Sequence, residues 1–174
     1  IISGLRTRVF VDEQGVSPEI ERDGEDEKPA TRHFLGFIAD KAVATGRVLA
    51  SGKIGRICLL PEYRGKGLGK AFVQSILIDL LENAERRECY LHAQTQALNF
   101  YQQCGFSAEG EVFQEADMAH QRMLIGLDDI HLAPLLYGDQ VVRCSGAQAF
   151  QHHAQRIINA GSRKVDILSI GLDD

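Results

Sequence analysis

Hydrophobic and polar positions alternate along the first third of the chain. Three runs rich in β-branched and aromatic residues predict strands: "HFLGFIAD", "AVATGRVLA" and "KIGRICLLP". A tight hairpin at Asp40-Lys41 is predicted between the first two runs, and Pro61 ends the third. We therefore expect three antiparallel strands in a row. Before them, residues 3 to 16 show the spacing of a helix with one buried face.

The period changes from two to 3.6 residues at Leu68. Apolar residues then recur every three or four positions as far as Ala84, which predicts the longest helix of the chain. The segments that follow predict a short strand, "CYLHA", a short helix, "QALNFYQQC", that ends at Gly105, and a closing antiparallel pair, "GEVFQE" and "QRMLIGL". The order of strands, helix, strand, helix and strands predicts an α/β (α+β) layered domain.

Composition limits the function classes. With 174 residues, 44% of them hydrophobic, the chain can bury a core of one domain and a fragment of a second. No apolar run approaches the roughly 20 residues that cross a bilayer, and "IISGLRTRVF" lacks the features of a signal peptide, so we expect a cytoplasmic protein. The four cysteines are widely spaced, without C-x-x-C. We therefore expect no metal, no membrane contact and no nucleic acid.

Positive charge gathers in "YRGKGLGK", between the third strand and the long helix, although the net charge is -5. A glycine-rich turn lets the backbone approach a ligand, and the unpaired N–H groups of the helix then point at it. This arrangement is typical of a phosphate site. The spacing is not that of a nucleotide P-loop, and a Rossmann loop would need glycine where Lys70 stands.

The segment "LLPEYRGKGLG" resembles the coenzyme A pyrophosphate loop of the GCN5-related N-acetyltransferases (GNATs). "ALNFYQQCGF" resembles a second hallmark of that family, a short helix with a tyrosine followed by Gly-Phe. "RVFVDEQGVSPEIERDGED", "HFLGFI" and "EGEVFQEADMAHQRM" are similar to the ElaA-like branch, so that the resemblance covers roughly residues 5 to 127. The first strand of the family would precede Ile1 and is absent here, which leaves the sheet edge and part of the substrate pocket in question.

The resemblance implies a GNAT fold, a central and mostly antiparallel sheet with helices on both faces. It implies a bacterial enzyme that transfers acetyl from acetyl-CoA to the primary amine of a small molecule or peptide, by direct attack in a ternary complex. Tyr101 would be the general acid, and backbone N–H groups around Leu59 and Leu60 would hold the acetyl carbonyl and the pantetheine. The implied cofactor-binding residues are Cys58, Leu59, Leu60, Arg64, Gly65, Lys66, Gly67, Leu68, Gly69, Lys70 and Asn99.

The acceptor side is less defined. Candidate substrate residues are Glu13, Gln14, His33 and His120, and candidate bases include Glu13, Glu19, Glu21 and His33. For each of them a solvated, capping or structural role fits the sequence equally well. The run "EIERDGEDE" has six acids in nine positions and predicts a solvated loop, which could steer a cationic amine such as a polyamine, a lysine side chain or an aminoglycoside.

The matched motifs lie within residues 1–135, the predicted acetyltransferase domain. Residues 136–174 are interpreted as a linker and the start of a truncated second α/β segment, with a helix at 148–158 and a strand at "KVDILSI". This tail weakly resembles the start of a phospholipase-D-like module, but the H-x-K signature is missing. Two other functions stay open, acyl-homoserine-lactone synthesis and non-catalytic acyl-CoA sensing. The protein could also form a homodimer.

Overall fold

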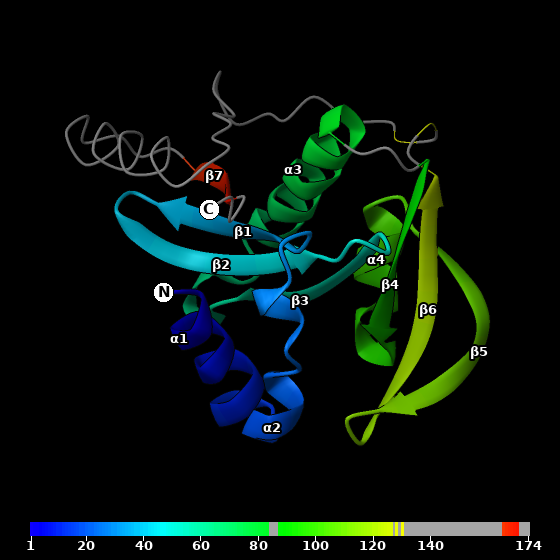
Figure 1. Ribbon diagram of the computed structural model, residues 1–174, viewed down its shortest axis with the longest axis horizontal. Helices are drawn as coiled ribbons and strands as arrows, with labels where there is room; N and C mark the ends of the chain where they lie inside the picture. The colour runs from blue at the N-terminus through cyan, green and yellow to red at the C-terminus, as the bar shows by residue number, and fades with distance from the viewer. Residues whose placement is uncertain (84–86, 127, 129, 131–164, 171–174) are drawn as a thin grey trace.

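The computed structural model describes residues 1–83, 87–126, 128, 130 and 165–170. Its strands form one sheet in the order β5-β6-β4-β3-β2-β1-β7 (Figure 1). All neighbouring strands are antiparallel except β3 and β4, which confirms the mostly antiparallel sheet. The bounds are β1 (Arg32–Ile38), β2 (Lys41–Val48), β3 (Lys53–Leu59), β4 (Glu88–Gln94), β5 (Ser107–Glu115), β6 (Met118–Gly126) and β7 (Val165–Ile170).

The helices predicted at residues 3–16, 68–84 and 96–104 lie close to their expected positions, whereas a further short helix overlaps the start of the run predicted as a solvated loop. The helices are α1 (Ile2–Arg6), the π-helical η1 (Thr7–Glu13) that continues it, α2 (Pro18–Glu21), α3 (Leu68–Asn83) and α4 (Leu98–Gln103), with short 3-10 turns η2 (Glu25–Glu27), η3 (Pro61–Tyr63) and η4 (Thr95–Ala97). The first hairpin turn is one residue earlier than predicted. Ala39 and Asp40 form it, with Ala39 at a φ of 51°, and Lys41 already belongs to β2.

Hydrophobic residues cover both faces of the sheet, because successive strand residues point to opposite sides. Phe34 of β1 packs in the core with α3 and α4, whereas the next residue, Leu35, packs with Leu5 and Val9 of the N-terminal helices. The prediction of helices on both faces of the sheet is therefore confirmed. Gly36 and Gly46 bring α3 close to the sheet, since a Cβ on either glycine would lie 3.1 Å from a side-chain atom of α3.

The parallel strands β3 and β4 separate soon after they pair. Their register includes only Lys53 with Tyr90 and Ile54 with Leu91. Beyond these pairs β3 continues to Leu59 and β4 to Gln94, and the two strands diverge toward their carboxyl ends (Figure 1). Backbone groups that face this gap therefore have no partner strand.

The tail contributes one described element. The predicted strand "KVDILSI" contains β7, which pairs with β1 from His33↔Ile170 to Ile38↔Val165. The other predictions for the tail, including the helix at 148–158, lie outside the described residues, so the division at residue 135 stays a prediction. None of the helices in the described ranges has the length and apolarity needed to cross a membrane.

Candidate active site

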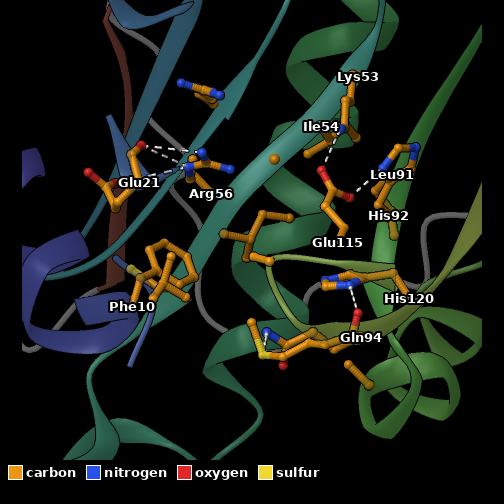
Figure 2. Close-up of a pocket in the computed structure, with 18 of the residues that line it drawn as sticks. Phe10, Glu21, Lys53, Ile54, Arg56, Leu91, His92, Gln94, Glu115 and His120 are labelled. Carbon is orange, nitrogen blue, oxygen red and sulfur yellow. Dashed lines mark hydrogen bonds and ion pairs between the residues drawn. The ribbon is translucent and has the colours of Figure 1, made fainter. Parts of the chain in front are cut away.

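An open cavity of about 820 Å³ is lined by both diverging strands (Figure 2). Its walls also include η1, the acidic loop after α2, Tyr101 of α4 and the turn between β5 and β6. Of the residues predicted from the sequence, the cavity brings together Gln14, Cys58, Leu59, Arg64, Tyr101 and His120. Glu21, one of the candidate bases, lines it as well, and the other predicted site residues do not.

The backbone of Leu59 faces the gap. Leu60 N–H donates to the Val43 carbonyl (2.9 Å), and Leu59 lies opposite Ala44 in β2. This is the antiparallel pairing in which the N–H and C=O of Leu59 point away from β2. Arg64 Nε donates to the Leu59 carbonyl (2.9 Å), which leaves the Leu59 N–H directed at the gap. The N–H of Leu60 is already engaged by Val43, so of the two predicted backbone donors it is Leu59 that faces the gap.

The glycine-rich loop has the backbone that its sequence requires. Gly65 and Gly67 have φ values of 73° and 77°, in the left-handed region that disfavours other residues. Gly69 lies in the first turn of α3, and a Cβ there would be 3.5 Å from the Phe100 ring. Lys66 donates to the Glu62 carbonyl (3.0 Å). The loop is exposed, and the first N–H groups of α3 lack helical partners.

Two ion pairs tie the approach to this loop to the N-terminal helix. Arg64 donates two hydrogen bonds to the Glu13 carboxylate (2.6 and 2.8 Å), and Arg8 donates two to Glu62 (3.1 Å each). The hydrogen bond from Arg64 lowers the pKa of Glu13, which keeps this carboxylate ionised and occupied. Glu13 was a candidate base and substrate ligand, and the structure instead gives it a structural partner.

Tyr101 lines the cavity from α4. Its ring makes edge contacts with Phe100 and Phe106, at centroid distances of 4.9 and 5.9 Å. Burial, helped by the nearby Cys104, raises the pKa of the Tyr101 phenol. The hydroxyl therefore stays protonated at neutral pH and is able to donate a proton or a hydrogen bond. Asn99, on the same short helix, is exposed and does not line the cavity.

The two predicted histidines have different positions. His33 is 4% exposed, lies outside the cavity lining, and places Nε2 3.3 Å from the Asp26 carbonyl, so it supports the acidic loop rather than a substrate. His120 lines the cavity, and its Nδ1 donates to the Met118 carbonyl (2.9 Å). That bond defines the tautomer of His120 and leaves Nε2 as an acceptor.

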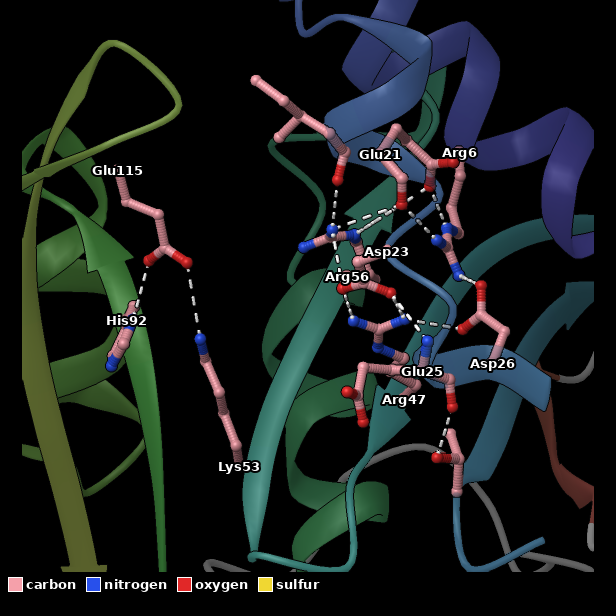
Figure 3. A network of polar contacts seen from close by, with 12 residues as sticks. Arg6, Glu21, Asp23, Glu25, Asp26, Arg47, Lys53, Arg56, His92 and Glu115 are labelled. Atoms are coloured by element: carbon pink, nitrogen blue, oxygen red, sulfur yellow. Dashed lines mark hydrogen bonds and ion pairs between the residues drawn. The ribbon is translucent and has the colours of Figure 1, made fainter. Parts of the chain in front are cut away.

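The acidic segment is not simply a solvated loop, which corrects the expectation for half of its acids. An ion-pair network joins it to the N-terminal helix and to two strands (Figure 3), through Arg6, Glu21, Asp23, Asp26, Arg47 and Arg56. Arg6 and Glu21 form its most buried pair, with side chains 3% and 5% exposed. Because arginines balance these acids, only part of the run is free to steer a cation.

We expect this network to make stability fall in acid. Burial raises the pKa of Asp23, but hydrogen bonds from Arg47 and from the Glu25 N–H outweigh it and leave the pKa at about 2. The contribution of Asp23 is thus complete above its unfolded pKa of about 3.9 and is lost as the pH falls toward 2. Urea unfolding at a series of pH values between about 5 and 2 measures the decline, which should be shallower in Asp23→Asn. Equal slopes would contradict this expectation.

Lys53, His92 and Glu115 form a second polar cluster in the cavity, which was not predicted from the sequence (Figures 2 and 3). His92 Nδ1 lies 2.7 Å from one carboxylate oxygen of Glu115, and Lys53 Nζ lies 3.4 Å from the other. Burial raises the pKa of Glu115, but these two partners outweigh it and lower the pKa. The position of His92 could have been predicted from the alternation in "CYLHA". Leu91 and Ala93 are buried, so His92 between them points to the opposite, open face of the strand.

A metal site finds no support in the part of the chain that the structure describes, where no three His, Cys, Asp or Glu side chains are placed to hold an ion. Cys58, Cys89 and Cys104 are buried and free. Burial raises the pKa of Cys58, which lines the cavity, to about 12. This thiol is therefore neutral at physiological pH and is not a nucleophile.

Comparison with known proteins identifies the family. The profile described as "Acetyltransferase (GNAT) domain" matches residues 5–127. Protein ElaA of Escherichia coli is 34% identical over 122 residues, which cover 67% of this chain and 79% of ElaA. Uncharacterized protein YyaT of Bacillus subtilis is 36% identical over 123 residues, which cover 68% of this chain and 82% of YyaT.

Solved structures agree with this match. The crystal structure of E. coli ElaA has a TM-score of 0.65 and covers 71% of this chain and 86% of that one. An acyl-CoA N-acyltransferase from Pseudomonas aeruginosa, 32% identical, has a TM-score of 0.64 with the same coverage. Spermidine N-acetyltransferase from Vibrio cholerae, in complex with CoA and spermine, is 18% identical at a TM-score of 0.58 and shares the fold. The chain therefore belongs to the GNAT acetyltransferase family, in its ElaA-like branch, and is an N-acetyltransferase.

Proposed function

We propose that the chain transfers acetyl from acetyl-CoA to a primary amine of a small molecule or peptide, by direct attack within a ternary complex. The observation that carries this proposal is the cavity between β3 and β4. It has the Leu59 N–H on one side and the protonated Tyr101 hydroxyl on the other. The two donors are the groups that an acetyl thioester needs as its carbonyl and its sulfur gain negative charge.

The residues present fit coenzyme A. Its pyrophosphate matches the glycine-rich loop, where Gly67 leads into α3 and Lys66 and Lys70 add positive charge around unpaired N–H groups. Its pantetheine arm matches the gap, because Leu59 offers there a backbone donor without a strand partner. We assign Cys58 and Leu60 to packing beneath this arm, since both are buried at the end of β3.

The proposed reaction proceeds in one bond exchange. The amine nitrogen attacks the thioester carbonyl carbon while the carbon–sulfur bond breaks, giving an amide and the coenzyme A thiol. The Leu59 N–H stabilises the oxygen that becomes negative, and Tyr101 gives its proton to the departing sulfur. The amine nitrogen releases one proton to a base, and Tyr101 recovers one from water. Residues 1–135 are the proposed catalytic unit, because every group used here lies within them.

The loop assignment predicts that Gly67→Val weakens acetyl-CoA binding at least tenfold, about 1.4 kcal/mol. The added side chain would occupy the space that the pyrophosphate needs. Gly110→Val is the matched control, since Gly110 has a similar φ of 70° with no atom within 4 Å of its Cβ position, yet lies in β5. Isothermal titration calorimetry measures both affinities. Unchanged binding in Gly67→Val, or equal loss in both variants, would contradict the assignment.

Transfer itself is tested by thiol release from acetyl-CoA with spermidine, Nα-acetyl-L-lysine amide and kanamycin as acceptors. We expect release that depends on an amine, together with an acetylated product of matching mass. Binding of acetyl-CoA without amine-dependent release for any of them would favour the sensor function over the enzyme.

A further inference from the structure

The cluster of Lys53, His92 and Glu115 stands at the point where β3 and β4 part. The two parallel strands pair first at Lys53 with Tyr90 and last at Ile54 with Leu91. His92 is the next residue along β4, on the face opposite the buried Leu91, and lines the cavity (Figure 2). An imidazole is thus located at the closed end of the gap that we assign to the pantetheine arm and its thioester.

The hydrogen bonding of His92 defines its tautomer. An ionised carboxylate only accepts hydrogen bonds, so the 2.7 Å contact with Glu115 requires the proton of the neutral ring on Nδ1. Nε2 then carries a lone pair, and no described residue donates to it. The side chain is 24% exposed, so solvent or a substrate in the cavity can reach the ring.

The neighbours of His92 hold the ring in place. Lys53 of β3 binds the second oxygen of Glu115, and Phe113 of β5 contacts the His92 ring edge-on at 4.8 Å. Tyr90, on the same strand, lies 6.0 Å away and is covered by the Arg122 guanidinium of β6. The His92 ring therefore contacts one carboxylate directly, whereas the cations Lys53 and Arg122 contact its neighbours.

We propose that His92 is the general base of the acetyl transfer, and that Glu115 is the residue that positions it; this inference rests on the function proposed above. Nε2 accepts a proton from the amine nitrogen as that nitrogen bonds to the carbonyl carbon. Tyr101 supplies a separate proton to the sulfur, so the products are a neutral amide, a thiol, the Tyr101 phenolate and an imidazolium, and one proton then passes through water from the imidazolium to the phenolate. The Glu115 carboxylate stabilises the imidazolium while it exists.

Three other groups near the site fit this role less well. Glu13 is held by Arg64, and Glu21 is buried against Arg6. His120 also exposes an Nε2 acceptor, but its Nδ1 donates to a neutral carbonyl, and only 8% of the residue is exposed. His92 combines an Nε2 that the cavity reaches with a carboxylate on Nδ1 that orients the ring, which selects His92.

The first test uses His92→Ala. We expect kcat/KM for the amine to fall about 10²- to 10⁴-fold, with acetyl-CoA affinity unchanged and with partial recovery on addition of imidazole. His120→Ala is measured beside it. If His92→Ala keeps the parental kcat/KM, or if imidazole rescues His120→Ala instead, the assignment of His92 is overturned while the transferase function stands. If the parent releases no thiol with any of the three amines, the transferase function itself fails.

The second test addresses Glu115. Glu115→Gln should lower kcat/KM less than His92→Ala does, because the base remains, and should shift the ¹⁵N signals of the His92 ring away from the Nδ1–H tautomer. Glu109→Gln is the matched control on the same strand, since Glu109 forms only an exposed pair with Arg122. Loss of activity in Glu115→Gln without a tautomer change, or equal loss in Glu109→Gln, would overturn the positioning role.

Discussion

Tyr101→Phe is expected to lower the kcat of acetyl transfer by about 10²- to 10⁴-fold, the range typical of general acid catalysis. The substitution removes one oxygen and keeps the ring that packs against Phe100 and Phe106. Acetyl-CoA affinity and thermal stability should therefore change little. The effect isolates the chemical role of the hydroxyl, because burial keeps that group protonated and ready to donate.

Steady-state thiol release, calorimetry and thermal unfolding measure the three quantities. Tyr63→Phe provides the comparison, since Tyr63 also loses only a hydroxyl and lies outside the cavity lining. If the Tyr101→Phe enzyme keeps more than about half of the parental kcat with its best acceptor, water protonates the leaving thiolate and Tyr101 is a packing residue.

The order of strands and helices could be predicted because the patterns that define it are local. The apolar positions of α3 repeat every three or four residues, and Ile76 and Leu77 are fully buried as this repeat requires. The position of the first hairpin turn was predicted less exactly. The first hairpin turn needs a positive φ, which Ala39 adopts although its side chain gives no sign of it.

The acidic segment shows where local patterns fail. A run of acids followed by proline has the composition of a solvated loop, yet its ion partners come from α1, β2 and β3. Arg6 lies 15 residues from Glu21, and Arg47 lies 24 residues from Asp23. Only the folded sheet brings these charges together, so the sequence alone could not distinguish a buried network from a hydrated one.

The candidate site likewise has one part that sequence motifs predict and another that they do not. The glycine-rich loop and Tyr101 belong to continuous motifs, and a motif of this kind has a recognisable spacing. His92 and Glu115 lie 23 residues apart and meet because the β5–β6 hairpin brings Glu115 to the strand β4. The availability of the Leu59 N–H likewise depends on the register with β2 and on the divergence from β4. Both features are tertiary, and neither leaves a trace in residue spacing.

Arg6→Met is expected to lower the free energy of unfolding by about 3–5 kcal/mol, the cost typical of breaking a buried ion pair. Glu21 is 5% exposed, so without Arg6 its carboxylate would stay desolvated. The nearest remaining cation is Arg56, whose Nε is 4.0 Å away. Urea denaturation at neutral pH measures the change, and a loss below about 1 kcal/mol would contradict the importance of the pair.

The double variant Arg6→Met/Glu21→Leu separates the pair from the packing around it. Removing both charges leaves no buried carboxylate without a partner, so this variant should recover most of the stability lost in Arg6→Met. If the double variant is as unstable as the single one, the loss comes from the other contacts of Arg6, with Asp26 and the Glu21 carbonyl, rather than from the unpaired charge. Because Glu21 lines the cavity, thiol release by the double variant also reports whether this acid has a role beyond holding the N-terminal helix against the sheet.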